Sequence, residues 1–159
     1  MIWEALDSSL IAIGLEADDY KDVMKNLGSV LIKEGYAKES YVNALIARED
    51  EFPTGLDVDG VGVAIPHTSV DHVNKVGIAI ATLDKPVTFV QMGTDDETVG
   101  VQLVFMLAVV DPNAHIDQLQ RIIEIIQDKA VLTSLMEAKK ADEIIDIVRE
   151  KEAALRNSK

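Results

Sequence analysis

Residues 59–69 have the sequence DGVGVAIPHTS, an apolar stretch that ends at a proline and is followed at once by His67. From Val61 to Ile65, branched residues alternate with glycine and alanine, and this period of two predicts a strand that is closely covered in a sheet. Pro66 has no N–H to donate, so we expect strand pairing to end there. The stretch therefore predicts a strand of an α/β sheet with a histidine just beyond its end.

His67 is the first candidate for chemistry. Ligand crevices in α/β sheets form beyond the carboxyl ends of strands, which is where this histidine is expected. A neutral imidazole is nucleophilic near pH 7 and can carry a phosphoryl group and release it again, so phosphoryl transfer suits His67 better than acyl or glycosyl transfer. The alternative interpretation is a solvent-exposed or hydrogen-bonded loop histidine, and the position alone does not exclude it.

Composition limits the classes of protein to consider. The chain has 159 residues, of which 48% are hydrophobic and 27% charged, enough for one domain with a sizeable core but not comfortably for two. The 28 acidic and 15 basic residues give a net charge of −13, which argues against nucleic acid or an anionic membrane surface as a partner.

Cysteine is absent, so disulfides, thiolate metal sites and a cysteine nucleophile are excluded. We expect a cytoplasmic protein with no signal peptide and no membrane insertion, since the start of the chain lacks a basic region and no apolar run is long enough to cross a bilayer.

Ahead of the His67 strand, the pattern predicts one strand and two helices. We expect a strand over residues 9–15, a helix that starts at Asp18 and Asp19 and stops at Gly35, and a second helix from an N-cap at Ser40 to about Glu49. Phe52-Pro53-Thr54-Gly55 is then predicted to be a turn that leads into the His67 strand.

Beyond His67, we predict a strand over residues 77–83, a turn at residues 84–86 and a short extension over 87–90. The run at 100–110 favours a buried central strand, with a buried helix as the competing interpretation. The final third is expected to be helical, with segments at 119–126 and 132–148, breaks near Asp128 and Lys139, and a charged last helix over 141–156. Residues 1–159 thus form one predicted α/β domain, with a mostly parallel or mixed sheet of four or five strands and helices on both faces.

Three further residues are candidates for holding an anion. Arg48, in the last turn of a predicted helix, either complements the helix C-terminus or grips phosphate through two parallel hydrogen bonds. His115 falls in the first turn of a helix opened by Asp111-Pro112, where it should stay neutral and contact a phosphoryl oxygen, unless it is simply exposed. Thr54 could offer its hydroxyl, although turn residues more often have no such role. The three histidines show no metal-ligand spacing, and His72 is interpreted as a loop residue.

Three motifs in order resemble a known family. They are ALIARE at 44–49, FPTG at 52–55 and GVAIPH at 62–67. Together they resemble the type-2 IIA domain of the bacterial sugar phosphotransferase system, the fructose, mannitol and galactitol group. The pair ALIARE and EFPTG is most similar to the galactitol-type branch, and the resemblance covers essentially the whole chain.

The resemblance implies a cytoplasmic phosphocarrier without metal, nucleotide or other cofactor. It implies that His67 accepts a phosphoryl group on Nε2 from the carrier HPr and passes it to a IIB component, which works with a membrane IIC component. Arg48 matches the family's arginine, His115 falls where many members carry a second histidine, and Thr54 is a possible contact. No IIB or IIC region is seen in the chain, so a separate acceptor is expected.

Two other functions stay open on the same motifs. One is a regulatory phospho-sensor that controls other proteins by binding them, and the other is a non-catalytic interaction domain of the same fold. The sugar also stays open, because a IIA domain does not touch it; galactitol, another polyol or a pentitol all fit.

Overall fold

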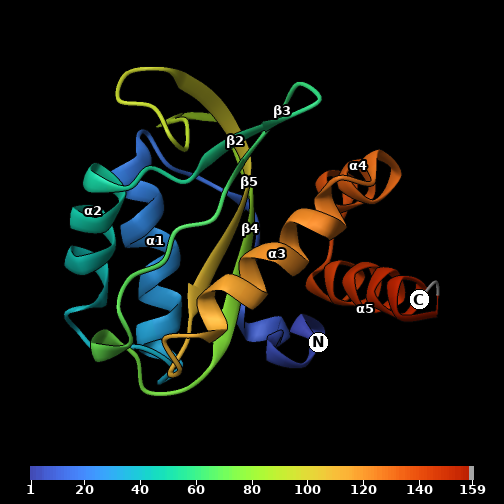
Figure 1. The fold of residues 1–159 in the computed structure, drawn as a ribbon, viewed down its shortest axis with the longest axis horizontal. Helices are drawn as coiled ribbons and strands as arrows, with labels where there is room; N and C mark the ends of the chain where they lie inside the picture. The colour runs from blue at the N-terminus through green and yellow to red at the C-terminus, as the bar shows by residue number, and fades with distance from the viewer. Residues whose placement is uncertain (158–159) are drawn as a thin grey trace.

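The computed structural model describes residues 1–157, in which a single sheet carries helices on both sides (Figure 1). The strands are β1 (Ile11–Leu15), β2 (Gly55–Val58), β3 (Val61–Ala64), β4 (Gly77–Val90) and β5 (Thr98–Ala108). The α-helices are α1 (Tyr20–Lys33), α2 (Tyr41–Glu51), α3 (Ala114–Ile126), α4 (Lys129–Glu137) and α5 (Ala141–Asn157). Three short 3-10 helices are η1 (Ile2–Ala5), η2 (Ser8–Leu10) and η3 (Val70–His72).

The sheet is mixed, and its strand order is β1-β4-β5-β3-β2. β1 runs parallel to β4 and β3 parallel to β5, whereas the β4–β5 and β2–β3 pairs are antiparallel. The predicted α/β class with a mixed sheet of up to five strands is confirmed. β3 therefore lies inside the sheet, and the chain leaves its carboxyl end to reach Pro66 and His67.

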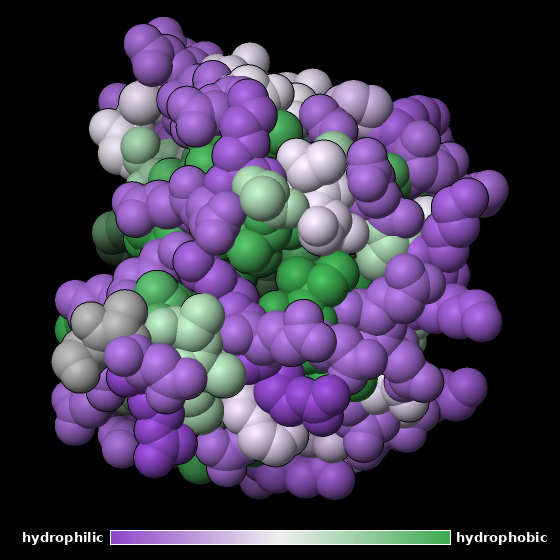
Figure 2. Space-filling view, turned by 90° about the vertical axis from the view of Figure 1, so that its right-hand side faces the viewer, coloured by the Kyte–Doolittle hydropathy of each residue, from purple (hydrophilic) through white to green (hydrophobic). Residues whose placement is uncertain are grey.

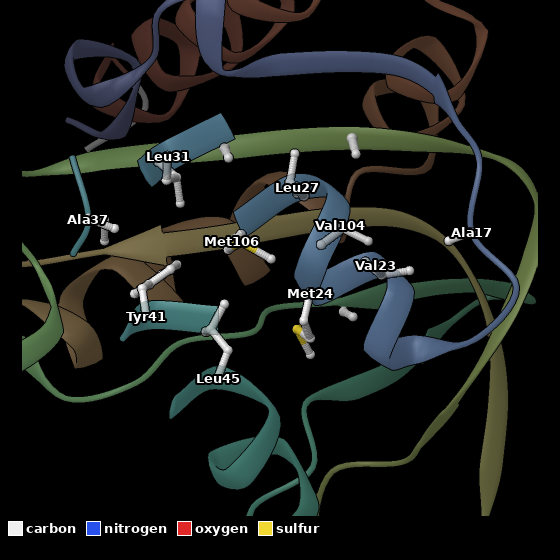
Figure 3. Close-up of a cluster of buried hydrophobic side chains, with 14 of the residues drawn as sticks. Ala17, Val23, Met24, Leu27, Leu31, Ala37, Tyr41, Leu45, Val104 and Met106 are labelled. Carbon is white, nitrogen blue, oxygen red and sulfur yellow. The ribbon is translucent and has the colours of Figure 1, made fainter. Parts of the chain in front are cut away.

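Each face of the sheet has its own hydrophobic core. Helices α1 and α2 cover one face, where Leu27, Leu31 and Tyr41 belong to the same buried cluster as Val104 and Met106 of β5 (Figure 3). Helices α3, α4 and α5 cover the other face with a second buried cluster. Figure 2 views the molecule from this second side and shows hydrophilic residues over most of it, with hydrophobic ones in a central hollow. Within residues 1–157, no helix is both long enough and apolar enough to span a membrane.

β2 and β3 form a tight hairpin that sets up the His67 strand. Its two-residue loop is Asp59-Gly60, and both residues have positive φ, 50° and 90°, as a type I′ hairpin turn requires. On its other side β3 approaches β5 so closely that a Cβ atom on Gly62 would lie 2.0 Å from the carbonyl oxygen of Gly100. A glycine is needed there because the two backbones leave no room for a side chain.

Several predicted elements are confirmed, with shifts at their ends. α1 has its N-cap at Asp19, and Gly35 after it has φ 83°. The run at 100–110 is a strand, β5, and not a helix. α4 and α5 are separated near Lys139, as predicted. At α2, Ser40 holds the N-cap position without a side-chain capping bond, because its hydroxyl is paired with the ring of His72 instead.

Three expectations were wrong. The strand expected over 9–15 begins only at Ile11, because Asp7 accepts a hydrogen bond from the Ser9 N–H and holds residues 8–10 in a 3-10 turn. β2 is absent from the predicted elements, and only its first residue, Gly55, falls within the turn predicted over 52–55. The predicted turn at 84–86 lies within one continuous strand, β4, where Pro86 is tolerated because the pairing with β5 shifts register between Thr82 and Val87.

Candidate functional site

His67 lies just past the end of β3, on a backbone that the sheet holds in place. The Leu107 N–H donates to the carbonyl oxygen of Pro66 at 3.0 Å, which ties this segment to β5. The ring Nδ1 of His67 lies 3.0 Å from the carbonyl oxygen of Ile65. A carbonyl oxygen only accepts, so Nδ1 carries the proton of the neutral ring and Nε2 keeps its lone pair.

His115 comes from the first turn of α3 and faces the same site. Its ring centroid lies 5.1 Å from that of His67, with the rings tilted by 42°. The Nε2 atom of His115 is buried and has no hydrogen-bond partner within residues 1–157. Its other ring nitrogen hydrogen-bonds the backbone of Thr68. The site therefore contains a buried polar atom that no other group of the described chain satisfies.

Arg48 completes the group from the last turn of α2. Its guanidinium lies over the ring of Phe52, 4.3 Å from the ring centroid, in a cation–π contact. Arg48 is exposed, and none of the salt bridges within residues 1–157 involves it. The two histidines and this arginine line a pocket of about 230 Å³, together with Thr68, Ser69, Val70, Asp71 and Pro112.

The surroundings of both histidines in the pocket favour their neutral forms. Burial is the main reason that the pKa of His67 lies below 6.5, and the positive charge of Arg48 lowers it further, against the opposing hydrogen bond to Ile65. Burial also lowers the pKa of His115, followed by the charges of His67 and Arg48, while the bond to Thr68 raises it. The direction agrees with the low pKa expected for His115, and burial is the largest cause of it.

Thr54 is buried and does not line this pocket. Its hydroxyl donates to Glu49 at 2.8 Å and accepts from the Ile65 N–H at 3.2 Å, so both of these bonds are made inside the protein. The structure holds the Thr54 hydroxyl against the backbone of Ile65 and not in the pocket lining. A contact between Thr54 and a bound anion stays a prediction.

Glu49 is the residue near the site that sequence reasoning missed. It is buried although it lies in the last turn of α2, beside the exposed Arg48. Burial raises its pKa, and two hydrogen bonds from Thr54 oppose the rise. A glutamate near a helix end normally indicates an exposed position, so its place within the ALIARE motif was the only signal that could have singled it out.

His72 lies outside the pocket lining, and its Nδ1 pairs with the hydroxyl of Ser40 at 2.8 Å. His72 was expected in a loop, and it is the last residue of the short 3-10 helix η3, which lies in the connection between β3 and β4. Within residues 1–157, no group of three or more histidine, cysteine or acidic side chains is arranged to hold a metal ion. In this pocket the guanidinium of Arg48 suits an anion, and the free Nε2 lone pair of His67 suits attack on an electrophilic atom such as phosphorus.

The sequence and the fold both have known relatives. Residues 4–151 match a family model described as "Phosphoenolpyruvate-dependent sugar phosphotransferase system, EIIA 2". The galactitol-specific EIIA component of Escherichia coli (strain K12) is 30% identical over 123 residues, which are 77% of this chain and 81% of that protein.

Two solved structures are similar over most of the chain. One is enzyme IIAMTL in complex with phosphorylated enzyme IIBMTL from Escherichia coli, with 25% identity and a TM-score of 0.75 over 91% of this chain and 96% of that one. The other is the nitrogen regulatory protein IIA-Ntr from Neisseria meningitidis, with 30% identity and a TM-score of 0.76 over 92% of this chain and 98% of that one.

Proposed function

The chain belongs to the EIIA 2 family of the phosphoenolpyruvate-dependent sugar phosphotransferase system, and from this we propose that it is a cytoplasmic phosphocarrier that uses His67. In this proposal, His67 accepts a phosphoryl group from phosphorylated HPr and passes it to a IIB component that works with a membrane IIC component. The similarity to a IIA enzyme solved together with its phosphorylated IIB enzyme supports the choice of acceptor.

The observation that carries the proposal is the hydrogen bond from Nδ1 of His67 to the Ile65 carbonyl. It leaves the Nε2 lone pair free to attack phosphorus in line with the donor's phosphorus–nitrogen bond. As the new bond forms, the old one breaks and its electron pair returns to the donor imidazole. The His67 ring then carries a positive charge, which its Nδ1–H bond to the carbonyl stabilises.

Arg48 and His115 are proposed to hold the phosphoryl oxygens. The guanidinium of Arg48 is placed over Phe52 and can grip two oxygens at once. Before transfer His115 is neutral. Its bond to the Thr68 backbone raises its pKa, which is the effect of a bond that the ring donates. The one proton of the neutral ring is therefore used in that bond, and Nε2 carries none. A phosphoryl group on His67 raises the pKa of His115. Nε2 of His115 then takes up a proton, and the resulting N–H donates a hydrogen bond to a phosphoryl oxygen.

We propose a galactitol-type system as the biological context. The identity of 30% with a galactitol-specific EIIA component supports it. A second candidate function, regulation through binding of other proteins, is supported by the equal identity of 30% with the nitrogen regulatory protein IIA-Ntr. Both functions require phosphoryl acceptance on His67, and only the transport function requires transfer onward to IIB.

The test is incubation with phosphorylated HPr, followed by intact-mass measurement. The unaltered protein gains one phosphoryl group, and His67→Ala gains none while its circular dichroism is unchanged, because His67 lies outside the packed strands. His72→Ala is the matched control, since this histidine lies outside the pocket, and it is expected to be labelled fully. Full labelling of the His67→Ala protein contradicts the proposal. Addition of IIB then separates transport from regulation.

A further inference from the structure

A chain of hydrogen bonds leads from a buried carboxylate to the His67 ring. The Thr54 N–H donates to Oε2 of Glu49 at 2.7 Å, and the Thr54 hydroxyl donates to Oε1 at 2.8 Å. The same hydroxyl oxygen accepts from the Ile65 N–H at 3.2 Å. The carbonyl of Ile65 in turn accepts from Nδ1 of His67 at 3.0 Å. Three links in series thus connect Glu49 to the His67 ring, and the first of them consists of two parallel hydrogen bonds from Thr54.

The two backbone N–H groups in this chain can only donate. While Glu49 is ionised its carboxylate only accepts, so the Thr54 hydroxyl then points its hydrogen at Glu49. A lone pair of the hydroxyl then remains to accept from the Ile65 N–H, and this bond holds the backbone of Ile65 at its amide nitrogen. On the other side the Ile65 carbonyl only accepts, so the proton of the neutral His67 ring stays on Nδ1 for as long as the Ile65 backbone holds this carbonyl against the ring.

We propose that Glu49 is a positioning residue that acts through Thr54 and Ile65 to fix the tautomer and orientation of His67, leaving Nε2 as the nucleophile. Glu49 is only 6% exposed and does not line the His67 pocket, so it does not act by touching the phosphoryl group. The effect on phosphoryl transfer rests on the proposed function, whereas the effect on the tautomer does not.

A purely structural role for Glu49 is the alternative to be separated. In that case its carboxylate only closes the turn between α2 and β2 by binding the Thr54 N–H. Loss of the carboxylate would then lower stability without changing which ring nitrogen of His67 carries the proton. The readout must therefore be the tautomer itself.

Glu49→Gln is the main variant, because it keeps the size of the side chain and removes one of its two acceptors. The ¹⁵N NMR signals of the His67 ring, recorded well above its pKa, show which nitrogen is protonated. We expect Nδ1–H alone in the unaltered protein and a measurable share of Nε2–H in Glu49→Gln. Glu51→Gln is the matched control: it is the same exchange two residues later, at an exposed side chain, and should leave the signals unchanged.

Thr54 variants keep the test decisive if Glu49→Gln does not fold. Thr54→Ser retains the hydroxyl and should retain the Nδ1–H tautomer, whereas Thr54→Val removes the hydroxyl and should lose it. If Thr54→Val, and Glu49→Gln where it folds, both leave the tautomer unchanged, the positioning role is wrong.

Rates of labelling by phosphorylated HPr give the second arm of the experiment. Glu49→Gln and Thr54→Val should each lower the rate about tenfold, the effect of losing one such hydrogen bond. The double variant should lose about the same tenfold and not a hundredfold, because both act through a single chain. Additive losses would contradict the shared chain. An unaltered protein that accepts no phosphoryl group would overturn the proposed function, while the NMR result would still decide the role of Glu49.

Discussion

At the scale of single residues, Arg48 has two separable effects on His67. Burial is the main cause of the low pKa of His67, and the charge of Arg48 is the second contribution that lowers it. The planar guanidinium of Arg48 also offers paired hydrogen bonds that an ammonium group does not have. Charge and geometry can therefore be tested with two different substitutions.

Replacement of the charge should change the pH dependence of phosphoryl acceptance. Attack requires an unprotonated Nε2, so the rate is full above the pKa of His67 and falls as the pH drops through it, with a midpoint below 6.5. Arg48→Gln removes a positive charge and should move this midpoint upward, while Arg48→Lys should leave it in place and slow transfer to IIB about tenfold. Labelling rates across pH and an NMR titration of His67 measure the midpoint, and loss of the label after addition of IIB measures the transfer. If Arg48→Lys transfers at the normal rate, Arg48 serves only the helix terminus.

Sequence reasoning reached part of this site and could not reach the rest. His67, Arg48 and His115 were chosen from three separate segments, and the structure brings them to one pocket. The motif order allowed this, because a histidine past a strand end and an arginine at a helix end have recognisable positions. Glu49 was not found, because its burial depends on how α2 packs and not on any local pattern.

At the scale of elements, the close pairing of β3 with β5 determines where β3 ends and so where His67 lies along the sheet. A Cβ on Gly62 would lie 2.0 Å from the carbonyl oxygen of Gly100 and 2.9 Å from Cα of Val101, and both are backbone atoms that cannot rotate away. Any side chain at this position must push the two strands apart.

Gly62→Ala should therefore lower the free energy of unfolding by about 2 kcal/mol, as overpacking of a rigid site does. Urea denaturation measures the loss. Gly100→Ala, on the partner strand, is the comparison, because its nearest contact would be the side chain of Pro86 at 3.3 Å and its cost should be smaller. Equal stability of Gly62→Ala and the unaltered protein would show that the strands can separate at no cost.

The elements that were mispredicted share a physical reason. β2 is short and carries Asp57, so it has little apolar pattern of its own and depends on its pairing with β3. The Asp59-Gly60 pair was nevertheless a strong hairpin signal that could have revealed it. β4 looked interrupted because of Pro86, and only the register shift against β5 explains how a proline fits there.

At the scale of the whole molecule, one buried carboxylate joins the two ends of the described chain. Glu152 of α5 is fully buried and accepts hydrogen bonds from the N–H groups of Ile2 and Trp3, at 3.0 and 2.7 Å. The Arg121 side chain of α3 lies 3.4 Å from the same carboxylate. Glu152 thus connects η1, α3 and α5 on the side of the sheet opposite α1.

Glu152→Ala should lower the free energy of unfolding by about 3 kcal/mol, because it leaves two backbone N–H groups without their acceptor and removes the nearer of the two carboxylates that pair with Arg121. Thermal and urea denaturation measure the change, and Glu150→Ala, an exposed residue of the same helix, should have almost no effect. Phosphoryl acceptance by the folded variant should be normal, since none of these residues lines the His67 pocket. A loss of less than 1 kcal/mol would mean that the carboxylate contributes no more than a surface ion pair.

The bond between Ile2 and Glu152 also has a consequence for folding during translation. The two residues are separated by 150 positions, so the first turn of the chain is translated long before its partner. Until the last helix has emerged, the backbone donors of Ile2 and Trp3 have no carboxylate to bind, even if the sheet has already assembled. Segment η1 therefore gains these two bonds only after α5 has been synthesised, and its backbone donors stay open to other partners until then.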